Sequence, residues 1–434
     1  MDMTLLETLP SLRLATLTDR RDTDQYRDVW PLNTHFGQGG RLEIAGVALG
    51  EVADRYGTPV HVLDEADFRA RSREYLSALS GAEIAYAAEA LITKTVGQWV
   101  AGEGLALAVR SSGEIAVGLA AGVDPARMIL HGHGKSCADL RYAVSAGVGR
   151  IVVSSHTEIA LLSAQMSGRS RVLLRIAAAD GRAGGCGFDG HRAVEAARRI
   201  VNDPHLELVG LAADISCATG DPADYVHIVA DGMALMARIN RECHTEIRQL
   251  CIGGGERVAY RFGDPELDVS ALATAIDRTL DSLCAGHLRP HLIIEAGRSI
   301  AARAGVTVYR VLAVHHSDSG LRVVVDADVS DLGEDCLHVN HTVALVNRHP
   351  GGPVGRVSVV GRHSGIEVIR DAQLASDIHP GDVLAVACTG AYGHSMASSA
   401  RMTGRAPIVA VADGAERQIV RRETLTDLMS RDLG

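Results

Sequence analysis

The chain has 434 residues, of which 47% are hydrophobic and 22% are charged, and its formal net charge is −10. This composition is ordinary for a folded globular protein and leaves room for two domains. The acidic balance argues against a nucleic-acid-binding protein, because contact with phosphates requires a clustered basic excess.

The eight cysteines show no C-x-x-C pair and no short metal-ligand spacing, so we expect free thiols in a reducing compartment. Residues 1–21 carry acidic side chains and lack a continuous apolar run, which argues against a signal peptide. No stretch approaches the roughly 20 apolar residues that a membrane helix needs. These features predict a cytoplasmic protein.

Lysine is almost absent from the chain. Of the 43 basic residues, Lys94 and Lys135 are the only lysines, and the others are arginine. Because arginine stays protonated, it does not form a Schiff base. Any imine with a side chain would have to use one of these two lysines.

Short apolar runs alternate with helical stretches between about residues 60 and 300. Runs that read as strands lie at 126–134, 150–155, 171–178, 206–216, 249–255 and 291–297, and the first two are followed by helical stretches at 137–148 and 156–166. Strand–helix units whose strands lack polar alternation predict a parallel sheet buried on both faces. About eight such units predict an α/β fold, a (β/α)8 barrel over residues 61–300, with a doubly wound open sheet as the alternative.

The pattern changes after residue 300. Strand-like runs separated by turns lie at 306–316, 321–330, 341–348, 356–365, 382–392 and 407–422. They predict an antiparallel β domain over residues 301–434. We expect the N-terminal segment, residues 1–60, to contribute to this β domain.

Several ordered segments carry a resemblance to a known family. They include YGTPVHVLDEADFR at 56–69, HGHGKS at 131–136, EAGRS at 295–299, TGAY at 389–392 and RRET at 421–424. In this order they resemble the fold-type III decarboxylases that use pyridoxal phosphate (PLP), particularly diaminopimelate decarboxylase. The resemblance covers nearly the whole chain. It implies an alanine-racemase-like barrel, a C-terminal β domain, and a homodimer whose active sites draw on both subunits.

Part of the family's cofactor site is retained. Gly253, Gly254 and Gly255 follow a predicted strand, where backbone N–H groups can close on a phosphate with a helix N-terminus behind them. The resemblance implies further cofactor contacts: a carboxylate on the pyridine nitrogen, a phosphate and substrate clamp, and a tyrosine that reaches the phosphate from the β domain. The corresponding residues are Glu295, Gly297, Arg298 and Tyr392.

The family's imine-forming lysine is missing. The strand-end motif Y-A-V-K-A or Y-A-A-K-A reads Tyr86 to Ala90 here, with Glu89 in the lysine position. A carboxylate cannot form an imine. Lys94, five residues further on, should lie on the next helix and point in another direction. Lys135 matches a lysine that the family does not use for the imine.

Other family positions differ as well. In the segment that matches H-x-H-I-G-S, Asp214 replaces the histidine that stacks on the pyridine ring and Cys217 replaces the phosphate-binding serine. Ala108 replaces an aspartate that precedes the S-G-G-E loop of the family. The C-E-S-G-D motif has become a segment containing His363 and Ser364. At the substrate's distal end, Glu334 stands for an arginine and His338 for a tyrosine.

These replacements predict a repurposed enzyme that acts on an amino-acid-derived substrate by lyase or proton-transfer chemistry. In this hypothesis Glu89 and Asp214 form a carboxylate pair at the barrel mouth, with His363 or His394 nearby and Tyr392 beside them. Two carboxylates in a dry pocket repel each other, which should raise the pKa of one and provide both an acid and a base. The loss of the distal arginine predicts a substrate with a neutral or cationic distal end.

Three alternatives remain open. The protein could be a PLP decarboxylase that uses non-covalent PLP or another lysine, or a non-catalytic protein that binds a ligand. It could also hold a metal or haem through histidines such as His131, His133, His315, His316, His338, His341 and His363, although none has a recognised ligand spacing. No specific metal ligand is assigned.

Overall fold

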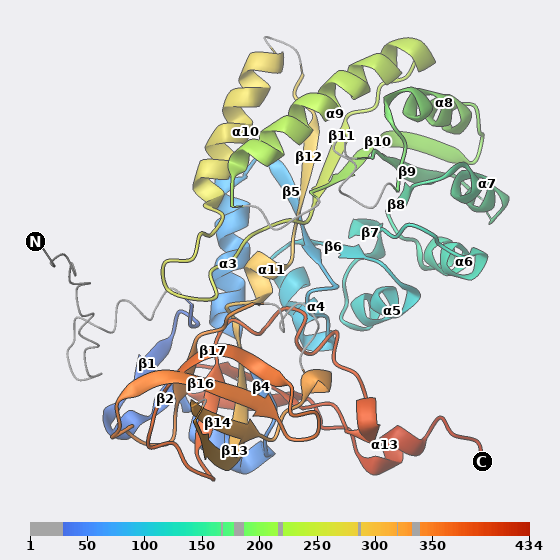
Figure 1. Cartoon of the computed structure of the whole chain (residues 1–434). Coiled ribbons are helices and arrows are strands. Elements are labelled where there is room, and N and C mark those ends of the chain that lie inside the picture. Colours follow the sequence, from blue (N-terminus) through green and yellow to red (C-terminus); the bar gives the residue numbers. More distant parts are fainter. Residues whose placement is uncertain are drawn as a thin grey trace, which may run out of the picture.

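The computed structural model describes residues 29–165, 168–177, 186–215, 220–284, 288–318, 320–331 and 339–434. A barrel of parallel strands surrounded by helices lies against a β domain, which gathers strands from both ends of the chain (Figure 1). Cys217, Glu334 and His338, three of the residues singled out in the sequence, lie outside the described residues.

The barrel is closed by eight strands in the order β10-β11-β12-β5-β6-β7-β8-β9, and every neighbouring pair is parallel. The strands are β5 (Ala82–Ala87), β6 (Ala106–Val109), β7 (Met128–Leu130), β8 (Arg150–Val153), β9 (Ser170–Arg175), β10 (Leu206–Asp214), β11 (Gln249–Gly253) and β12 (His291–Ala296). The predicted (β/α)8 barrel is therefore confirmed, and the open-sheet alternative is wrong.

Each barrel strand is followed by a helix. These are α4 (Lys94–Gly102), α5 (Ser112–Ala120), α6 (Cys137–Ala146), α7 (His156–Gln165), α8 (Gly190–Val201), α9 (Pro222–Cys243), α10 (Val269–Cys284) and the short α11 (Arg298–Ala301). The helix that precedes the barrel, α3 (Glu65–Ala78), begins at an aspartate cap, since Asp64 accepts hydrogen bonds from two backbone N–H groups. The strands are buried against these helices on the outside, which explains their continuous apolar sequences.

The inside of the barrel is filled by small and medium side chains. This cluster consists of Ala85, Ala106, Ala108, Ile129, Val152, Leu173, Val209, Ala212, Cys251 and Ile293. Four of the ten are alanines.

The β domain is built around a nine-stranded sheet that contains β4 (Val60–Asp64), β13 (Gly305–Ser317), β14 (Gly320–Val325), β15 (Val343–Leu345), β16 (Val354–Gly361), β17 (Glu367–Ala375), β18 (Val383–Val386), β19 (Ile408–Ala412) and β20 (Ala415–Val420). Most pairs are antiparallel, as predicted. Two pairs, β14 with β16 and β4 with β19, are parallel because long connections separate those strands in the chain.

The N-terminal part of the chain reaches the β domain through β4, which pairs with both β13 and β19. It also forms a separate small sheet of β1 (Thr34–Phe36), β2 (Leu42–Ile44) and β3 (Val47–Ala48), followed by α2 (Leu49–Tyr56). A short helix, α13 (Leu425–Met429), lies near the C-terminus (Figure 1). Of the described helices, none is both long enough and apolar enough to span a membrane.

The β domain also contacts the barrel mouth directly. The backbone N–H of Tyr392 donates a hydrogen bond of 2.7 Å to the carbonyl of Ala90. The Ser395 hydroxyl donates at 3.0 Å to the carbonyls of both Glu89 and Ala90. The segment after β18 is thereby attached to the loop after β5, which carries Glu89.

Candidate active site

The polar side chains of the site lie near or just after the C-terminal ends of six of the barrel strands. Parallel strands bring these ends to one mouth, which is where barrel enzymes place their active sites. The residues are Glu89 after β5, Arg110 after β6, His131 after β7, Arg175 at the end of β9, Asp214 at the end of β10, and Glu295 near the end of β12.

Glu89 is held by an arginine. Its carboxylate forms a two-pronged ion pair with Arg110, one prong through Nε and the other from Nη2 to Oε1 at 3.3 Å. The Tyr392 hydroxyl donates to the same Oε1 at 3.5 Å. About one third of the Glu89 side chain remains exposed, so a ligand at the mouth can reach it.

A second carboxylate, Asp214, has its own arginine. Asp214 forms an ion pair with Arg175, whose side chain is only 1% exposed. The predicted pairing of Glu89 with Asp214 is therefore not the arrangement found, since a guanidinium balances each carboxylate separately. The expected repulsion required two uncompensated charges in a dry pocket. Here an arginine compensates the charge of each carboxylate.

Glu295 lies deeper in the barrel and is 4% exposed. Its Oε1 lies 2.8 Å from His131 Nε2 and accepts a hydrogen bond of 2.9 Å from the Cys251 thiol. Burial favours protonation of Glu295, but His131, Cys251 and the charge of Arg110 together hold its pKa well below the usual range. Glu295 is thus an ionised carboxylate inside the barrel.

The proton on His131 can be assigned from its neighbours. Arg175 Nη2 lies 3.1 Å from His131 Nδ1, and a guanidinium can only donate. Nδ1 is therefore the acceptor, and Nε2, 2.8 Å from Glu295 Oε1, carries the proton. Burial lowers the pKa of His131, which agrees with a neutral ring.

His131, Cys251 and Glu295 form the one group of three or more metal-capable side chains found among the described residues, with their ligand atoms within 4.8 Å of one another. A metal ion would need the Nε2 lone pair of His131, which the proton occupies. It would also lie close to the positive charge of Arg175. These contacts favour a hydrogen-bond network over a metal centre.

Arg298 connects the barrel to the β domain. Its guanidinium carbon lies 4.9 Å from the centre of the Tyr392 ring, in a cation–π contact. Its Nη1 donates at 3.2 Å to the hydroxyl of Tyr260. Tyr392 therefore contacts both Arg298, a predicted cofactor-binding residue, and Glu89, a predicted catalytic residue.

The glycine turn after β11 has the backbone that was expected of it. Gly254 and Gly255 have φ values of 74° and 86°, a region that strongly favours glycine. A Cβ atom on Gly253 would lie 2.7 Å from Glu295 Oε2, so a side chain there would collide with the site. The helix predicted directly behind the turn is wrong, because α10 begins only at Val269 and a loop intervenes.

Glu256, the residue after this turn, is a buried carboxyl group that the sequence interpretation missed. It is 4% exposed, and its Oε1 has no hydrogen-bond partner among the described residues. Burial raises the pKa of Glu256 to about 7, although its own backbone N–H, that of Gly297 and the charge of Arg298 act in the opposite direction. A charged residue directly after a glycine triplet was the sequence signal that could have identified it.

The raised pKa of Glu256 predicts a pH-dependent effect of Glu256→Gln. The folded pKa of about 7 exceeds the usual value of 4.5, so the stability contributed by the protonated form is complete below about pH 4.5 and is lost as the pH rises through 7. Glutamine avoids this loss, and the variant should be more stable than the wild type at pH 8 by roughly 3 kcal/mol.

Urea denaturation at pH 4 and pH 8 measures this difference. The two proteins should have similar free energies of unfolding at pH 4. The same substitution at Glu246, whose side chain is 81% exposed, serves as the control and should show no such pH dependence. Equal stabilities of the wild type and Glu256→Gln at both pH values would contradict the assignment.

His363 and Ser364 lie in the turn between β16 and β17 of the β domain, and the backbone N–H groups of both donate to Asp328 at 3.0 Å. His363 is exposed. Among the described residues, the contacts of this turn are with the β domain, and none joins it to Glu89 or Asp214. A role for either residue at the barrel mouth remains a prediction.

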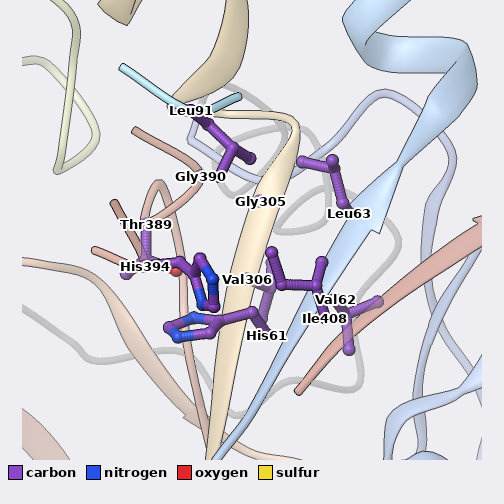
Figure 2. A pocket seen from close by; sticks show the side chains of 10 residues that line it. All are labelled: His61, Val62, Leu63, Leu91, Gly305, Val306, Thr389, Gly390, His394 and Ile408. Atoms are coloured by element: carbon purple, nitrogen blue, oxygen red, sulfur yellow. The ribbon is translucent and has the colours of Figure 1, made fainter. Parts of the chain in front are cut away.

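His394 lines a small cavity together with His61 and other residues of β4 and β13. Figure 2 shows its ring close to that of His61, and the ring centres are 5.5 Å apart. Burial lowers the pKa of His61 to about 3 and that of His394 to about 4, so both rings are neutral near pH 7. His394 therefore packs against residues of β4 and β13, and a role for it beside Glu89 remains a prediction.

The structure gives the surroundings of both lysines. Lys135 is buried, lies 3.0 Å from a Glu158 carboxylate oxygen and donates at 2.9 Å to the carbonyl of Gly132. Lys94 is exposed at the first residue of α4, behind the cap formed by Thr93.

The chain was compared with known proteins. Residues 65–302 match the family described as pyridoxal-dependent decarboxylase, pyridoxal binding domain. A diaminopimelate decarboxylase of Actinosynnema pretiosum subsp. auranticum is 40% identical, over 99% of this chain and 100% of its own length. That of Mycobacterium tuberculosis is 36% identical, over 94% of this chain and 98% of its own.

Solved structures have the same fold. The diaminopimelate decarboxylase of M. jannaschii in complex with L-lysine superimposes with a TM-score of 0.87 at 24% identity, covering 93% of this chain and 98% of that one. The Helicobacter pylori enzyme with L-lysine gives a TM-score of 0.79 at 25% identity, covering 88% of this chain and 98% of that one.

With its closed barrel, its β domain and this match, the chain belongs to the family of PLP-dependent decarboxylases of fold type III. Within this family it is close to diaminopimelate decarboxylase, and it is a diaminopimelate-decarboxylase-like protein.

Proposed function

We propose that this protein is an enzyme that acts on an amino-acid-derived substrate by proton transfer, decarboxylation or another lyase reaction, without a PLP–lysine imine. The observation that carries the proposal is the carboxylate of Glu89 at the mouth of the barrel, bound by Arg110 and Tyr392. A carboxylate can accept or donate a proton, but it cannot form the covalent link that an amine forms with an aldehyde.

The remaining residues do not fit a lysine-bound PLP. Lys135 is engaged with Glu158, and Lys94 is exposed at the start of a helix. Asp214 is an acid paired with Arg175, whereas the resemblance implied an aromatic ring stacked on the cofactor. We therefore derive no catalytic step through PLP, and we assign the proton transfer to groups of this chain.

The charges at the mouth suit an amino acid. Arg110 and Arg298 offer guanidinium groups to a carboxylate, and Glu89 and Asp214 offer carboxylates to an ammonium group. In the proposed reaction Glu89 moves a proton at the Cα of the substrate, which carries the substrate's carboxylate and ammonium groups. Tyr392 holds the acceptor oxygen of Glu89 in place. Release of Arg110 to the substrate's carboxylate would free Glu89 to act as a base.

The class of substrate is inferred from the relatives and from the site residues in which this chain differs from them. The M. jannaschii and Helicobacter pylori enzymes were crystallised with L-lysine. In the resemblance, Glu334 replaces an arginine, which favours a substrate whose distal end is neutral or cationic.

We also propose that the protein is a cytoplasmic homodimer in which the turn with His363 and Ser364 completes the partner's site. Light scattering and crosslinking can test the dimer.

The experiment uses protein treated with borohydride and dialysed, which inactivates any enzyme that depends on a lysine imine. A panel of amino acids, including meso-diaminopimelate, L-lysine and L-ornithine, is incubated with it in D2O and followed by NMR for exchange at Cα and for CO2 release. We expect at least one compound to react without added PLP. Activity that needs PLP, or that borohydride removes, would sink the proposal in favour of a PLP decarboxylase. Binding without any reaction would favour a non-catalytic protein.

A further inference from the structure

Two carboxylates and a glycine lie in one row across three neighbouring strands at the mouth of the barrel. Asp214 at the end of β10 pairs with Gly253 at the end of β11, and the register of β11 with β12 places Glu295 on the other side of Gly253. The residues two positions earlier in these strands fill the interior of the barrel: Ala212, Cys251 and Ile293. Because side chains alternate along a strand, Asp214 and Glu295 face the same interior, with the glycine between them.

Each of these two carboxylates has one oxygen that accepts no hydrogen bond from a described residue. The contacts of Glu295 use Oε1, and the ion pair of Asp214 with Arg175 uses Oδ2. The other oxygens both border Gly253, since a Cβ atom there would lie 2.7 Å from Glu295 Oε2 and 3.2 Å from Asp214 Oδ1. The two oxygens are therefore no further apart than two hydrogen-bond lengths, a span that one group with several N–H donors can bridge.

The charges in this row do not balance. Arg175 compensates Asp214, but the partner of Glu295 is His131, whose ring is neutral. Although burial favours protonation of Glu295, His131, the neighbouring thiol and the charge of Arg110 hold its pKa well below the usual range, so it is ionised near pH 7. Arg110 already forms an ion pair with another carboxylate. One negative charge is therefore left over beside the glycine, which favours a cationic group of a ligand.

An ammonium group suits these two oxygens better than a metal ion. A calcium ion takes about six to eight oxygen ligands, whereas the row offers two free oxygens. A primary ammonium group has three N–H donors and needs only acceptors. A quarter of the Asp214 side chain, 25%, is exposed, so a ligand at the mouth can reach it.

We propose that Asp214 Oδ1 and Glu295 Oε2 together bind a primary ammonium group of the substrate across Gly253. The inference rests on the proposed function for the location of the site, and it restricts the substrate to compounds that carry a primary amine. It gives Glu295, which the sequence assigned to the pyridine nitrogen of a cofactor, a role in binding the substrate itself. The two carboxylates hold the ammonium group, and Glu89 stays available for proton transfer.

The first test compares n-pentylamine, which is a primary ammonium ion at pH 7, with its neutral analogue pentan-1-ol. Dissociation constants are measured by ligand-observed NMR. The wild type should bind the amine about tenfold or more tightly than the alcohol, the usual contribution of a hydrogen bond to a charged group. Asp214→Asn and Glu295→Gln keep the size of each side chain and remove its charge, and each should lose this preference. Equal affinities of the wild type for both compounds would overturn the inference.

Two further variants locate the ammonium group. Glu246→Gln removes a carboxylate at the surface, where the side chain is 81% exposed, and should keep the full preference for the amine. Glu89→Gln should also keep it, because Glu89 lies outside the row. A preference lost in Glu89→Gln, but kept in Asp214→Asn and Glu295→Gln, would place the ammonium group at Glu89 and refute the proposed site.

A second measurement uses the wild type alone and applies if the variants do not fold. Pentyltrimethylammonium carries the charge of the amine without N–H donors, and it should bind no more tightly than pentan-1-ol. Magnesium chloride should displace pentylamine no better than sodium chloride of equal ionic strength. Tight binding of the quaternary ion, or specific displacement by magnesium, would each overturn the inference.

None of these measurements depends on turnover. A protein that binds pentylamine as expected but converts no amino acid would reject the proposed enzymatic function and retain the ammonium site. Turnover by a protein without any preference for the amine would reject the ammonium site alone.

Discussion

Glu89→Gln is expected to abolish turnover of whichever amino acid the protein converts, with a rate loss of about 10²–10⁴-fold, the usual contribution of a positioned acid or base. Glutamine has nearly the size of glutamate and can still accept hydrogen bonds from Arg110 and Tyr392 through its amide oxygen. It cannot take up and release a proton at neutral pH. The substitution therefore removes the proposed chemistry while it preserves most of the packing.

Exchange at Cα and product formation, measured over a range of substrate concentrations, give the rate and the Michaelis constant for each variant. A loss confined to kcat indicates that Glu89 acts in the chemical step. Glu246→Gln is the matched control, because the Glu246 side chain is 81% exposed and pairs with Arg248 and not with a residue of the proposed site. Full turnover by Glu89→Gln would show that another residue moves the proton.

Arg175→Leu is expected to lower the free energy of unfolding by about 3–5 kcal/mol, as is typical when one partner of a buried ion pair is removed. Arg175 is 1% exposed, forms the ion pair with Asp214 and donates to His131 Nδ1. Without it, Asp214 loses its counter-charge and the proton of His131 is no longer directed to Glu295. Lysine should not restore stability, because a single ammonium group does not reproduce the planar fork of arginine.

Urea denaturation followed by circular dichroism at pH 7 measures this loss. The control is Arg289→Leu, since Arg289 also pairs with two aspartates, Asp277 and Asp281, but at the surface. Surface ion pairs contribute little, so this variant should resemble the wild type. If Arg175→Leu were as stable as the wild type, the Asp214–Arg175–His131 chain would not be the structural core of the site. The double variant Arg175→Leu with Asp214→Leu should recover part of the loss, because no unpaired charge remains.

The sequence predicted the scaffold of this site well because strand and helix periodicities are local properties. Runs such as 150–155 and 249–255 are continuous apolar strands in both the prediction and the structure, as β8 and β11. The ends of parallel strands must meet at one mouth, so Glu89, Asp214 and Glu295 could be assigned to it before their neighbours were known.

The partners of these carboxylates could not be predicted in the same way. Arg110 follows β6, Arg175 ends β9 and Cys251 lies within β11, and the sequence does not show which of them meets a carboxylate. These contacts depend on barrel closure, because closure places strands that are far apart in the sequence side by side. Tyr392 contacts Glu89 across 303 residues, because the β domain is attached to the loop after β5.

The sequence by itself determined which chemistry is possible: residue 89 is a carboxylate, and only Lys94 and Lys135 could form an imine. These are properties of covalent structure and do not depend on the fold. The tertiary structure decided the charge of each carboxyl group in the site, because that charge depends on burial and on the group that faces the carboxyl. Thus Glu89 and Asp214, expected to face each other, each face an arginine, while Glu256 lies buried beside the glycine turn.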